Sequence, residues 1–303
     1  MDRRILAMKA GRFKQSQQLL FERRAFVRYS AVMVLDFTKM NGAGNDFVLI
    51  DNRARSLRLT KPQIARICDR QRGVGADGLL LLVPCESRRA DWAWQFYNND
   101  GSTAEMCGNG ARCFARFIQR HTDVKERTTF ETGAGIITAT FLGHQVSVGL
   151  TPPRELVVEQ KISLRDGTQT IHSINTGVPH AVLFVEDADQ AMVGPIGSEV
   201  RHHRHFAPKG TNVNFVQVKG PSFIQVRTYE RGVEGETLAC GTGVTAAALL
   251  SARVHGFQSP VKIQVQSGEF LEVSFQKEGN SFGGVTLTGP AEFVFDGRIE
   301  IPD

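Results

Sequence analysis

The sequence predicts an α+β protein of two pseudo-symmetric halves, each a largely antiparallel or mixed sheet around a buried central helix, with the active site in the cleft between them. First, short apolar runs rich in β-branched residues alternate with glycine-rich turns, whereas helical periods are few. Second, a short segment of the form Cys-Gly-X-Gly occurs twice, and each copy opens a helical period. A Rossmann fold is disfavoured because its helices would alternate with strands throughout the chain.

Residues 1–33 are expected to form a basic extension outside the fold. They hold eight Lys or Arg and two acidic residues, a net charge of +6, whereas the whole chain carries +5 and the remainder therefore −1. A strand-like alternating pattern begins only at Met33, so we favour translated upstream sequence in front of a start there. The near-neutral remainder lacks the charge of a nucleic-acid binder, and binding through the basic extension is the less favoured alternative.

The first half is predicted to comprise residues 34–150 together with 290–303. A helix is expected at 62–70, because Thr60 can cap it and a proline stands in its first turn. A second helix is expected at 108–120, where apolar side chains recur with helical spacing. Strands are expected at residues 47–51, 78–83, 92–98, 127–132, 135–141 and 145–150.

The second half is predicted to comprise residues 151–289, because Pro152-Pro153 is a stiff breaker pair at which the pattern begins again. A third helix is expected at 243–254. It is apolar on nearly every side and should therefore be buried. Strands are expected at residues 168–175, 180–185, 212–219, 222–230, 261–265, 270–275 and 285–295.

Composition limits the class of protein. The chain has 303 residues, of which 41% are hydrophobic and 22% charged, as in an ordinary globular protein with a sizeable core. The longest apolar run, residues 79–83, is far below the roughly 18 residues of a membrane-spanning helix. Five cysteines are an odd number in a long chain with no secretory leader, which predicts reduced thiols and a cytoplasmic location.

The repeated segments, Cys107-Gly108-Asn109-Gly110 and Cys240-Gly241-Thr242-Gly243, carry the chemistry. A helix N-terminus offers unpaired N–H groups and partial positive charge, and glycine lets a carboxylate approach that backbone closely. The same field favours a thiolate. One copy alone would more readily be a packed core cysteine. Two copies on facing halves would place a thiol on either side of one carbon atom, an arrangement that can invert a stereocentre.

Other motifs are read as structural. Cys68, Cys85 and Cys113 do not stand at helix starts, so core packing is their expected role. No Cys-X-X-Cys occurs, and the histidine-rich segment 201–205 lacks neighbouring carboxylates, so no metal site is expected and that segment reads as a solvated loop. Residues 73–78 satisfy the dinucleotide pattern but follow a helix and open a strand, which indicates a turn.

Four motifs together resemble the diaminopimelate epimerase family over residues 34–303. They are Asn-Gly-Ala-Gly-Asn-Asp-Phe at 41–47, Cys-Gly-Asn-Gly-Ala-Arg-Cys at 107–113, Glu-Arg-Gly-Val-Glu-Gly-Glu-Thr at 230–237 and Ala-Cys-Gly-Thr-Gly at 239–243. The resemblance implies cofactor-independent interconversion of LL- and meso-diaminopimelate, a step toward lysine and peptidoglycan precursors. It also implies a fold of two pseudo-symmetric halves that close on a small-molecule substrate.

The resemblance also implies roles for individual residues. Cys107 and Cys240 would be the catalytic thiols, one removing the Cα proton as thiolate while the other reprotonates the opposite face. His180 and Glu230 match positions that tune the cysteine protonation states. The matching substrate-binding positions are Asn45, Asn98, Gly108, Asn109, Asn212, Glu230, Arg231, Gly241 and Thr242. Gly78 and Val178 depart from members that have Gln and Asn there, so neither is assigned a contact.

Alternatives remain open at this point. A related cofactor-independent racemase of another amino acid, such as proline, would share the fold, as would an isomerase of the phenazine-biosynthesis type, which lacks the cysteine pair. From another class, a binding module or thiol redox sensor could retain both cysteines. No nucleic-acid or membrane partner and no cofactor are expected, and a homodimer is one option for the assembly.

Overall fold

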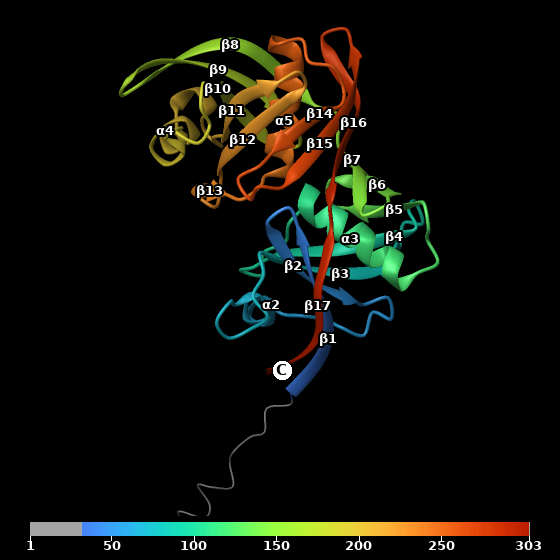
Figure 1. Cartoon of the computed structure of the whole chain (residues 1–303). Helices are drawn as coiled ribbons and strands as arrows, with labels where there is room; N and C mark the ends of the chain where they lie inside the picture. Colours follow the sequence, from blue (N-terminus) through green and yellow to red (C-terminus); the bar gives the residue numbers. More distant parts are fainter. Residues whose placement is uncertain (1–31, 303) are drawn as a thin grey trace, which may run out of the picture. The chain divides into compact units, whose positions relative to one another are not determined.

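A computed structural model describes residues 32–302 of the chain (Figure 1), so the predicted extension 1–33 lies almost entirely outside the described residues. Among the described residues, Leu35–Ile299 form one compact unit, and residues 32–34 and 300–302 are grouped apart from it. Every element of the candidate site belongs to the unit Leu35–Ile299, which contains both halves. The predicted boundaries at 150 and 289 between the two halves stay a prediction.

The first half of the unit begins with a hairpin of β1 (Val32–Gly42) and β2 (Asn45–Asp51), joined by Ala43 and Gly44, which both have positive φ. Helix α2 (Lys61–Cys68) follows, and Thr60 caps it as predicted, while Gln63 completes a capping box that was not predicted. Strand β2 pairs parallel with β3, and β3 pairs antiparallel with β4. The later strands are β3 (Gly78–Pro84), β4 (Trp92–Asn98), β5 (Arg127–Thr132), β6 (Gly135–Leu142) and β7 (Gln145–Gly149).

Helix α3 (Gly108–His121) is the buried centre of this half and packs against β2, β3, β6 and β7 (Figure 1). Its apolar face is the predicted one, and Phe114 lies 5.6 Å from Trp94 and 5.0 Å from Phe130 between ring centroids. Arg112 is fully buried on the same helix. The predicted helices 62–70 and 108–120 are thus confirmed.

Helix α5 (Gly241–Val254) is the buried centre of the second half and packs against β9, β10, β11, β12, β14, β15 and β16 (Figure 1). It begins two residues earlier than predicted. The pairs β10–β11 and β12–β14 are parallel, and the pairs β8–β9, β9–β10, β11–β12, β14–β15 and β15–β16 are antiparallel, so the sheet is mixed. The other elements are β8 (Arg154–Leu164), β9 (Gly167–Asn175), β10 (Pro179–Phe184), α4 (Val193–Arg201), η1 (Arg204–Phe206), β11 (Asn212–Gly220), β12 (Phe223–Glu230), β13 (Gly235–Thr237), β14 (Val261–Gln264), β15 (Phe270–Glu278), β16 (Ser281–Pro290) and β17 (Glu292–Pro302).

The second half differs from the prediction at four places. Strand β8 and helix α4 were not predicted, and α4 contains two glycines and a proline, which are poor helix formers. Gly197 is needed there because a Cβ would lie 2.6 Å from the Cβ of Tyr229. The predicted strand 285–295 is two strands that separate at Ala291, and the segment 201–205 is helical at both ends rather than a plain loop.

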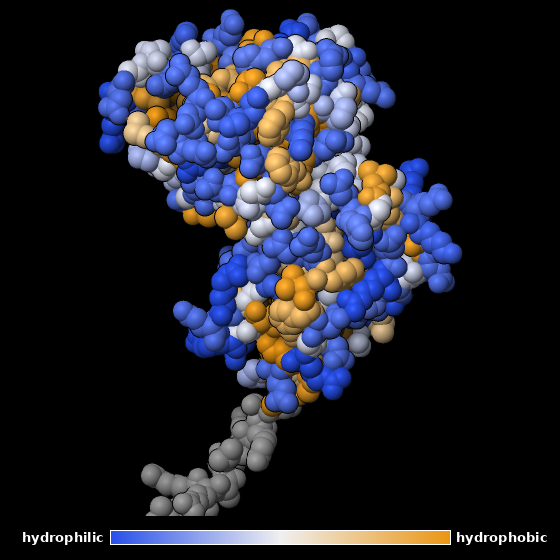
Figure 2. Space-filling model, viewed as in Figure 1, coloured by the Kyte–Doolittle hydropathy of each residue, from blue (hydrophilic) through white to orange (hydrophobic). Residues whose placement is uncertain are grey.

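The two halves share one continuous sheet, because β7 pairs antiparallel with β16 from Gly149↔Thr286 to Gln145↔Pro290. Helices α3 and α5 also contact each other. Hydrophilic side chains cover most of the face shown in Figure 2. Within residues 32–302, no helix is long and apolar enough to cross a membrane.

Candidate functional site

Both repeated cysteines stand where a strand-like backbone enters a buried helix. Cys107 is the N-cap of α3 with φ −145° and ψ 121°, and Cys240 is the N-cap of α5 with φ −120° and ψ 110°. The first N–H groups of each helix have no intrahelical partner. The sulfur of Cys107 accepts one of them, the N–H of Gly110, at 3.5 Å.

Glycines let the two helix starts touch. A Cβ added to Gly241 would lie 3.3 Å from the Cα of Gly108 and 3.1 Å from the Cδ2 of Leu287. A Cβ added to Gly108 would lie 2.9 Å from the same leucine atom. The two helix N-termini therefore meet backbone to backbone, which brings their positive ends and their N-cap thiols into one place.

The surroundings of the two thiols shift their pKa values in opposing directions. Burial is the largest effect and raises the pKa of both Cys107 and Cys240, and the nearby carboxylate of Glu230 raises both further. Hydrogen bonds from the Gly110 N–H to Cys107 and from the Thr242 side chain to Cys240 lower these pKa values. The charge of Cys107 also raises the pKa of Cys240, so the two thiols are close enough to interact. A thiolate on either one favours a thiol on the other.

Glu230 ends β12 and lies near both thiols. Burial is the main reason that its own pKa is raised, with a smaller contribution from Asp77, while the neighbouring Thr237 side chain opposes the shift. Arg231 is its neighbour in sequence, and the Arg231 N–H donates to the Oδ1 of Asn212 at 2.8 Å.

His180 is buried beside the start of α5. Its Nε2 lies 2.9 Å from the Oγ1 of Thr242, and that hydroxyl lies 3.5 Å from the sulfur of Cys240. Burial, with the positive charge of Arg231, lowers the pKa of His180 to about 3, so the imidazole is neutral in ordinary buffers.

Asn109 connects the two halves at the same point. Its Nδ2 donates to the Oδ1 of Asn45 at 2.6 Å and to the carbonyl of Ala239, which precedes Cys240, at 3.3 Å. The buried guanidinium of Arg112 donates to the Oδ1 of Asn109 at 3.0 Å. Asn45 in turn donates to Asp77 at 2.9 Å. Both asparagine amides are therefore held in defined orientations.

The predicted residues are brought together to different degrees. The two cysteines are surrounded by Gly108, Asn109, Gly241, Thr242, Glu230 and His180. Asn45 joins this cluster through its hydrogen bond with Asn109. Asn212 lies beside His180 in the paired strands β10 and β11 and donates to the carbonyl of Pro179 at 3.2 Å. Asn98 is exposed and bonds to Ser102 at 2.9 Å, so its place in a site rests on the resemblance alone.

Sequence reasoning missed three buried polar residues next to this cluster: Asn214, Thr228 and Arg112. The spacing Asn212-Val213-Asn214 was an available signal, because alternate residues of a strand share one face. Among the described residues, no group of three or more His, Cys, Asp or Glu side chains is arranged to hold a metal ion.

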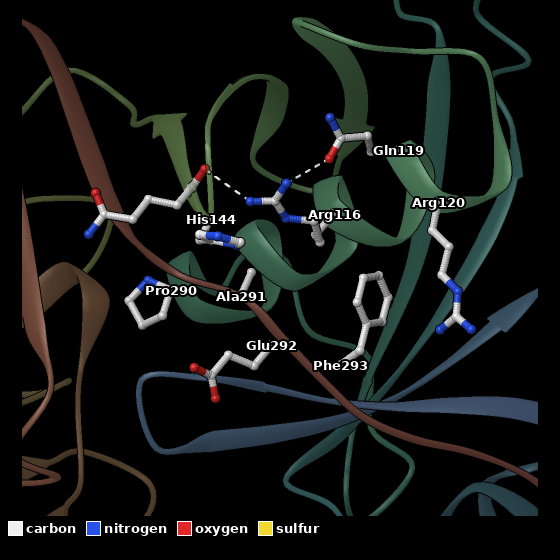
Figure 3. Close-up of a pocket in the computed structure, with 9 residues that line it drawn as sticks. Arg116, Gln119, Arg120, His144, Pro290, Ala291, Glu292 and Phe293 are labelled. Atoms are coloured by element: carbon white, nitrogen blue, oxygen red, sulfur yellow. Dashed lines mark hydrogen bonds between the residues drawn. The ribbon is translucent and has the colours of Figure 1, made fainter.

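A separate hollow lies between α3 and the start of β17. It encloses about 720 Å³, and Figure 3 shows Arg116 within it, hydrogen-bonded to the side chain of Gln119 and the carbonyl of Gln145. Neither cysteine of the pair lines it. We therefore place the candidate site at the helix N-termini rather than in this hollow.

The chain is similar to known proteins both in sequence and in fold. The family model described as diaminopimelate epimerase matches residues 37–154 and 172–294. The chain belongs to the diaminopimelate epimerase family. A diaminopimelate epimerase from Aquifex aeolicus is 45% identical over 278 residues, which cover 88% of this chain and 98% of that protein. One from a Hydrogenobaculum species is 42% identical over 276 residues, 86% of this chain and 97% of that protein. Family membership makes the protein an isomerase.

Solved structures confirm the fold class of this epimerase family member. A hydroxyproline epimerase from Agrobacterium vitis aligns with a TM-score of 0.67 at 15% identity, covering 89% of this chain and 92% of the other. A phenazine biosynthesis protein of the PhzF family from Bacillus anthracis aligns with a TM-score of 0.68 at 14% identity, covering 89% and 100%. At such identities the likeness concerns the fold alone.

Proposed function

We propose that the protein interconverts LL- and meso-diaminopimelate by two-base proton transfer, with the thiols of Cys107 and Cys240 acting on opposite faces of one carbon. Family membership supports the reaction. The observation that carries the residue assignment is the contact between Gly108 and Gly241, which brings two cysteine-capped helix N-termini together.

In this mechanism the substrate's α-carboxylate binds the free N–H groups at Gly108, Asn109, Gly241 and Thr242. As the Cα proton leaves, negative charge moves into that carboxylate, where the N–H groups and two helix dipoles stabilise it. One cysteine takes the proton as thiolate, and the other donates its own proton to the opposite face. The two exchange roles in the reverse direction.

The remaining charged and amide groups would recognise the substrate's other end. Asn45, Asn98, Asn212, Glu230 and Arg231 offer donors and acceptors for ammonium groups and a distal carboxylate. Such a second charged end distinguishes the proposal from a proline-type racemase, while an amino acid of histidine or glutamate type stays an alternative substrate. A thiol redox sensor would use the same cysteines without turnover.

The proposal includes a cytoplasmic location, supported by five free cysteines among the described residues, as expected in a reducing compartment. It leaves a homodimer as the assembly to be tested by analytical ultracentrifugation. Val294 and Phe295 on β17 are 56% and 48% exposed, so this strand presents apolar side chains to solvent.

The deciding experiment follows the Cα hydrogen. The purified, reduced protein is incubated with LL-diaminopimelate in D2O without added cofactor, and deuterium at Cα and the LL to meso ratio are measured together. The proposal predicts deuterium uptake with approach to a mixed equilibrium. No exchange by folded, reduced protein would overturn it and direct the assay to other amino acids, with Val178 as the first suspect for altered specificity.

We expect Gly241→Ala to reduce kcat/KM about a hundredfold, because the new methyl group would press on Gly108 and Leu287 and separate the two helix starts. Gly194→Ala is the matched control, since a Cβ there meets nothing within 4 Å. Kinetics and far-UV circular dichroism of both variants test this. Equal activities of the two folded variants would contradict a site at the glycine contact.

We expect Glu230→Gln to lower the thiol pKa of both Cys107 and Cys240, because it removes the negative charge that raises them. Alkylation by iodoacetamide at neutral pH should therefore accelerate at both cysteines. Epimerase kcat/KM should fall at the same time, since the substrate loses a contact. Peptide mass spectrometry after timed alkylation measures the first effect, and slower alkylation at either cysteine would contradict the assigned charge.

A further inference from the structure

We propose that Asn214 is a positioning residue: it fixes which nitrogen of His180 carries the proton and thereby directs the Thr242 hydroxyl hydrogen at the sulfur of Cys240. The inference deepens the proposed function, because it concerns how one of the two proposed catalytic thiols is held. Asn214 is fully buried in β11, under the first turn of α5. A Cβ on Gly243 would lie 2.4 Å from its Oδ1, so Gly243 admits it.

The neighbours of the Asn214 amide determine its orientation. Its Nδ2 donates to the carbonyl of Ala181 at 3.0 Å, and a carbonyl can only accept. Its Oδ1 accepts from the hydroxyl of Thr228 at 3.0 Å. A flipped amide would place two acceptors against each other at Ala181. The NH2 group is therefore the end that faces His180.

That orientation settles the tautomer of the imidazole. The Nδ2 of Asn214 lies 3.1 Å from the Nδ1 of His180, and an amide NH2 cannot accept a hydrogen bond. Nδ1 must therefore be the unprotonated nitrogen. Because the buried ring is neutral, its single proton is on Nε2, which lies 2.9 Å from the Oγ1 of Thr242.

The hydroxyl of Thr242 then has one direction left for its own hydrogen. It accepts from the Nε2–H of His180, and its second polar neighbour is the sulfur of Cys240 at 3.5 Å. The hydrogen bonds thus run from Asn214 through His180 and Thr242 to Cys240, each group donating to the next. A sulfur that receives such a hydrogen bond is better able to carry the thiolate charge.

This series of hydrogen bonds ends on only one of the two thiols, that of Cys240. In the first repeat Asn109 stands in the place of Thr242, and its amide is occupied by Asn45, Ala239 and Arg112. Cys107 receives a backbone N–H instead. Two charged groups bear on the ends of the hydrogen-bonded series: Arg231 acts on His180, and Glu230 acts on Cys240.

The first test reads the tautomer directly, in full-length protein labelled with 15N in its histidines. Long-range 1H–15N spectra assign protonated and unprotonated ring nitrogens, and loss of one signal set in His180→Gln identifies the residue. We expect His180 to carry its proton on Nε2 throughout pH 6–9. A proton on Nδ1, or a cationic ring in that range, overturns the proposal.

The second test measures the consequence at the thiols, by pH-dependent iodoacetamide alkylation resolved by peptide mass spectrometry. Asn214→Ala and Thr242→Val should each raise the pKa of Cys240 by about one unit or more. At a fixed pH below that pKa, the alkylation of Cys240 should therefore slow about tenfold or more. Cys107 should not change. Thr242→Ser should leave the alkylation rate of Cys240 as it is in the original protein, because it keeps the hydroxyl.

Further variants separate this role from simple support of the helix start. Thr176 donates to the carbonyl of Thr242 at 2.9 Å but is not one of the hydrogen-bonded groups that lead from Asn214 to Cys240. Thr176→Val should therefore leave the pKa of Cys240 unchanged. The double variant of Asn214→Ala with Thr242→Val should raise the pKa of Cys240 no further than either single variant does. The proposal is overturned if the pKa of Cys240 is unchanged in folded Asn214→Ala, or if the pKa values of Cys107 and Cys240 shift equally.

These measurements do not depend on turnover, so a failure of the epimerase assay leaves their outcome readable. If Asn214→Ala does not fold, the His180 spectrum of the unaltered protein and the Thr242 variants still decide. Thr242→Ser slowing as much as Thr242→Val would show that the hydroxyl is not the group that acts on Cys240, which also overturns the proposal.

Discussion

Cys107→Ala and Cys240→Ala will each lower kcat/KM for epimerisation by about 10²- to 10⁴-fold, the range expected when a positioned acid or base is removed. Inversion needs proton removal on one face and delivery on the other, so neither thiol can do both. Each stands at the N-cap of a buried helix and acts once in every inversion, so we expect losses of similar size. The coupled measurement of Cα deuterium and of the LL to meso ratio is the appropriate assay.

Cys85→Ala is the matched control for these variants, because Cys85 is a partly exposed thiol that bonds to Ser87 and Glu131 and not to the cluster. It should retain full activity. Retention of activity by either Cys107→Ala or Cys240→Ala would rule out the two-base assignment, whereas inactivity of all three variants would point to a general requirement for free thiols.

Mild oxidation will abolish activity by linking Cys107 to Cys240. The helix starts that carry them touch through Gly108 and Gly241, so we expect the two N-cap sulfur atoms to come close enough to be linked. Dithiothreitol should restore activity in full. Non-reducing peptide mapping should identify one crosslinked pair, and oxidised Cys85→Ala should give the same pair.

Two results would contradict that expectation. Activity that persists after complete oxidation would mean that the thiols do not face each other, and inactivation with a different crosslink would place the effect elsewhere. Substrate or a substrate-like amino acid present during oxidation should slow the loss, because a molecule between the thiols keeps them apart.

Local signals carried much of the correct prediction. Thr60 and Gln63 form the capping box that starts α2, and the two Cys-Gly-X-Gly segments start α3 and α5. At α2 and α3 the N-cap side chain accepts one of the free N–H groups of the helix start, which is why such local signals work there. The fold class followed from the same local patterns.

Features that depend on distant segments could not be read in this way. Arg112 is buried because its guanidinium donates to the carbonyls of Gly42, Gly108 and Pro290, which are far apart in sequence. Asn214 likewise acquires its role only when β10, β12 and α5 surround it. Helix α4 went unseen because its glycines and proline argue locally against a helix that tertiary packing stabilises.

The pairing of β7 with β16 also sets the order in which this protein can be completed during synthesis. Gln145 leaves the ribosome long before its partner Pro290, with about 140 residues between them. At about 5–20 residues per second, the edge of β7 waits roughly 7 to 30 seconds for its neighbour. The sheet of the first half is therefore finished only when nearly the whole chain has emerged, and until then β7 is open to pairing with other chains.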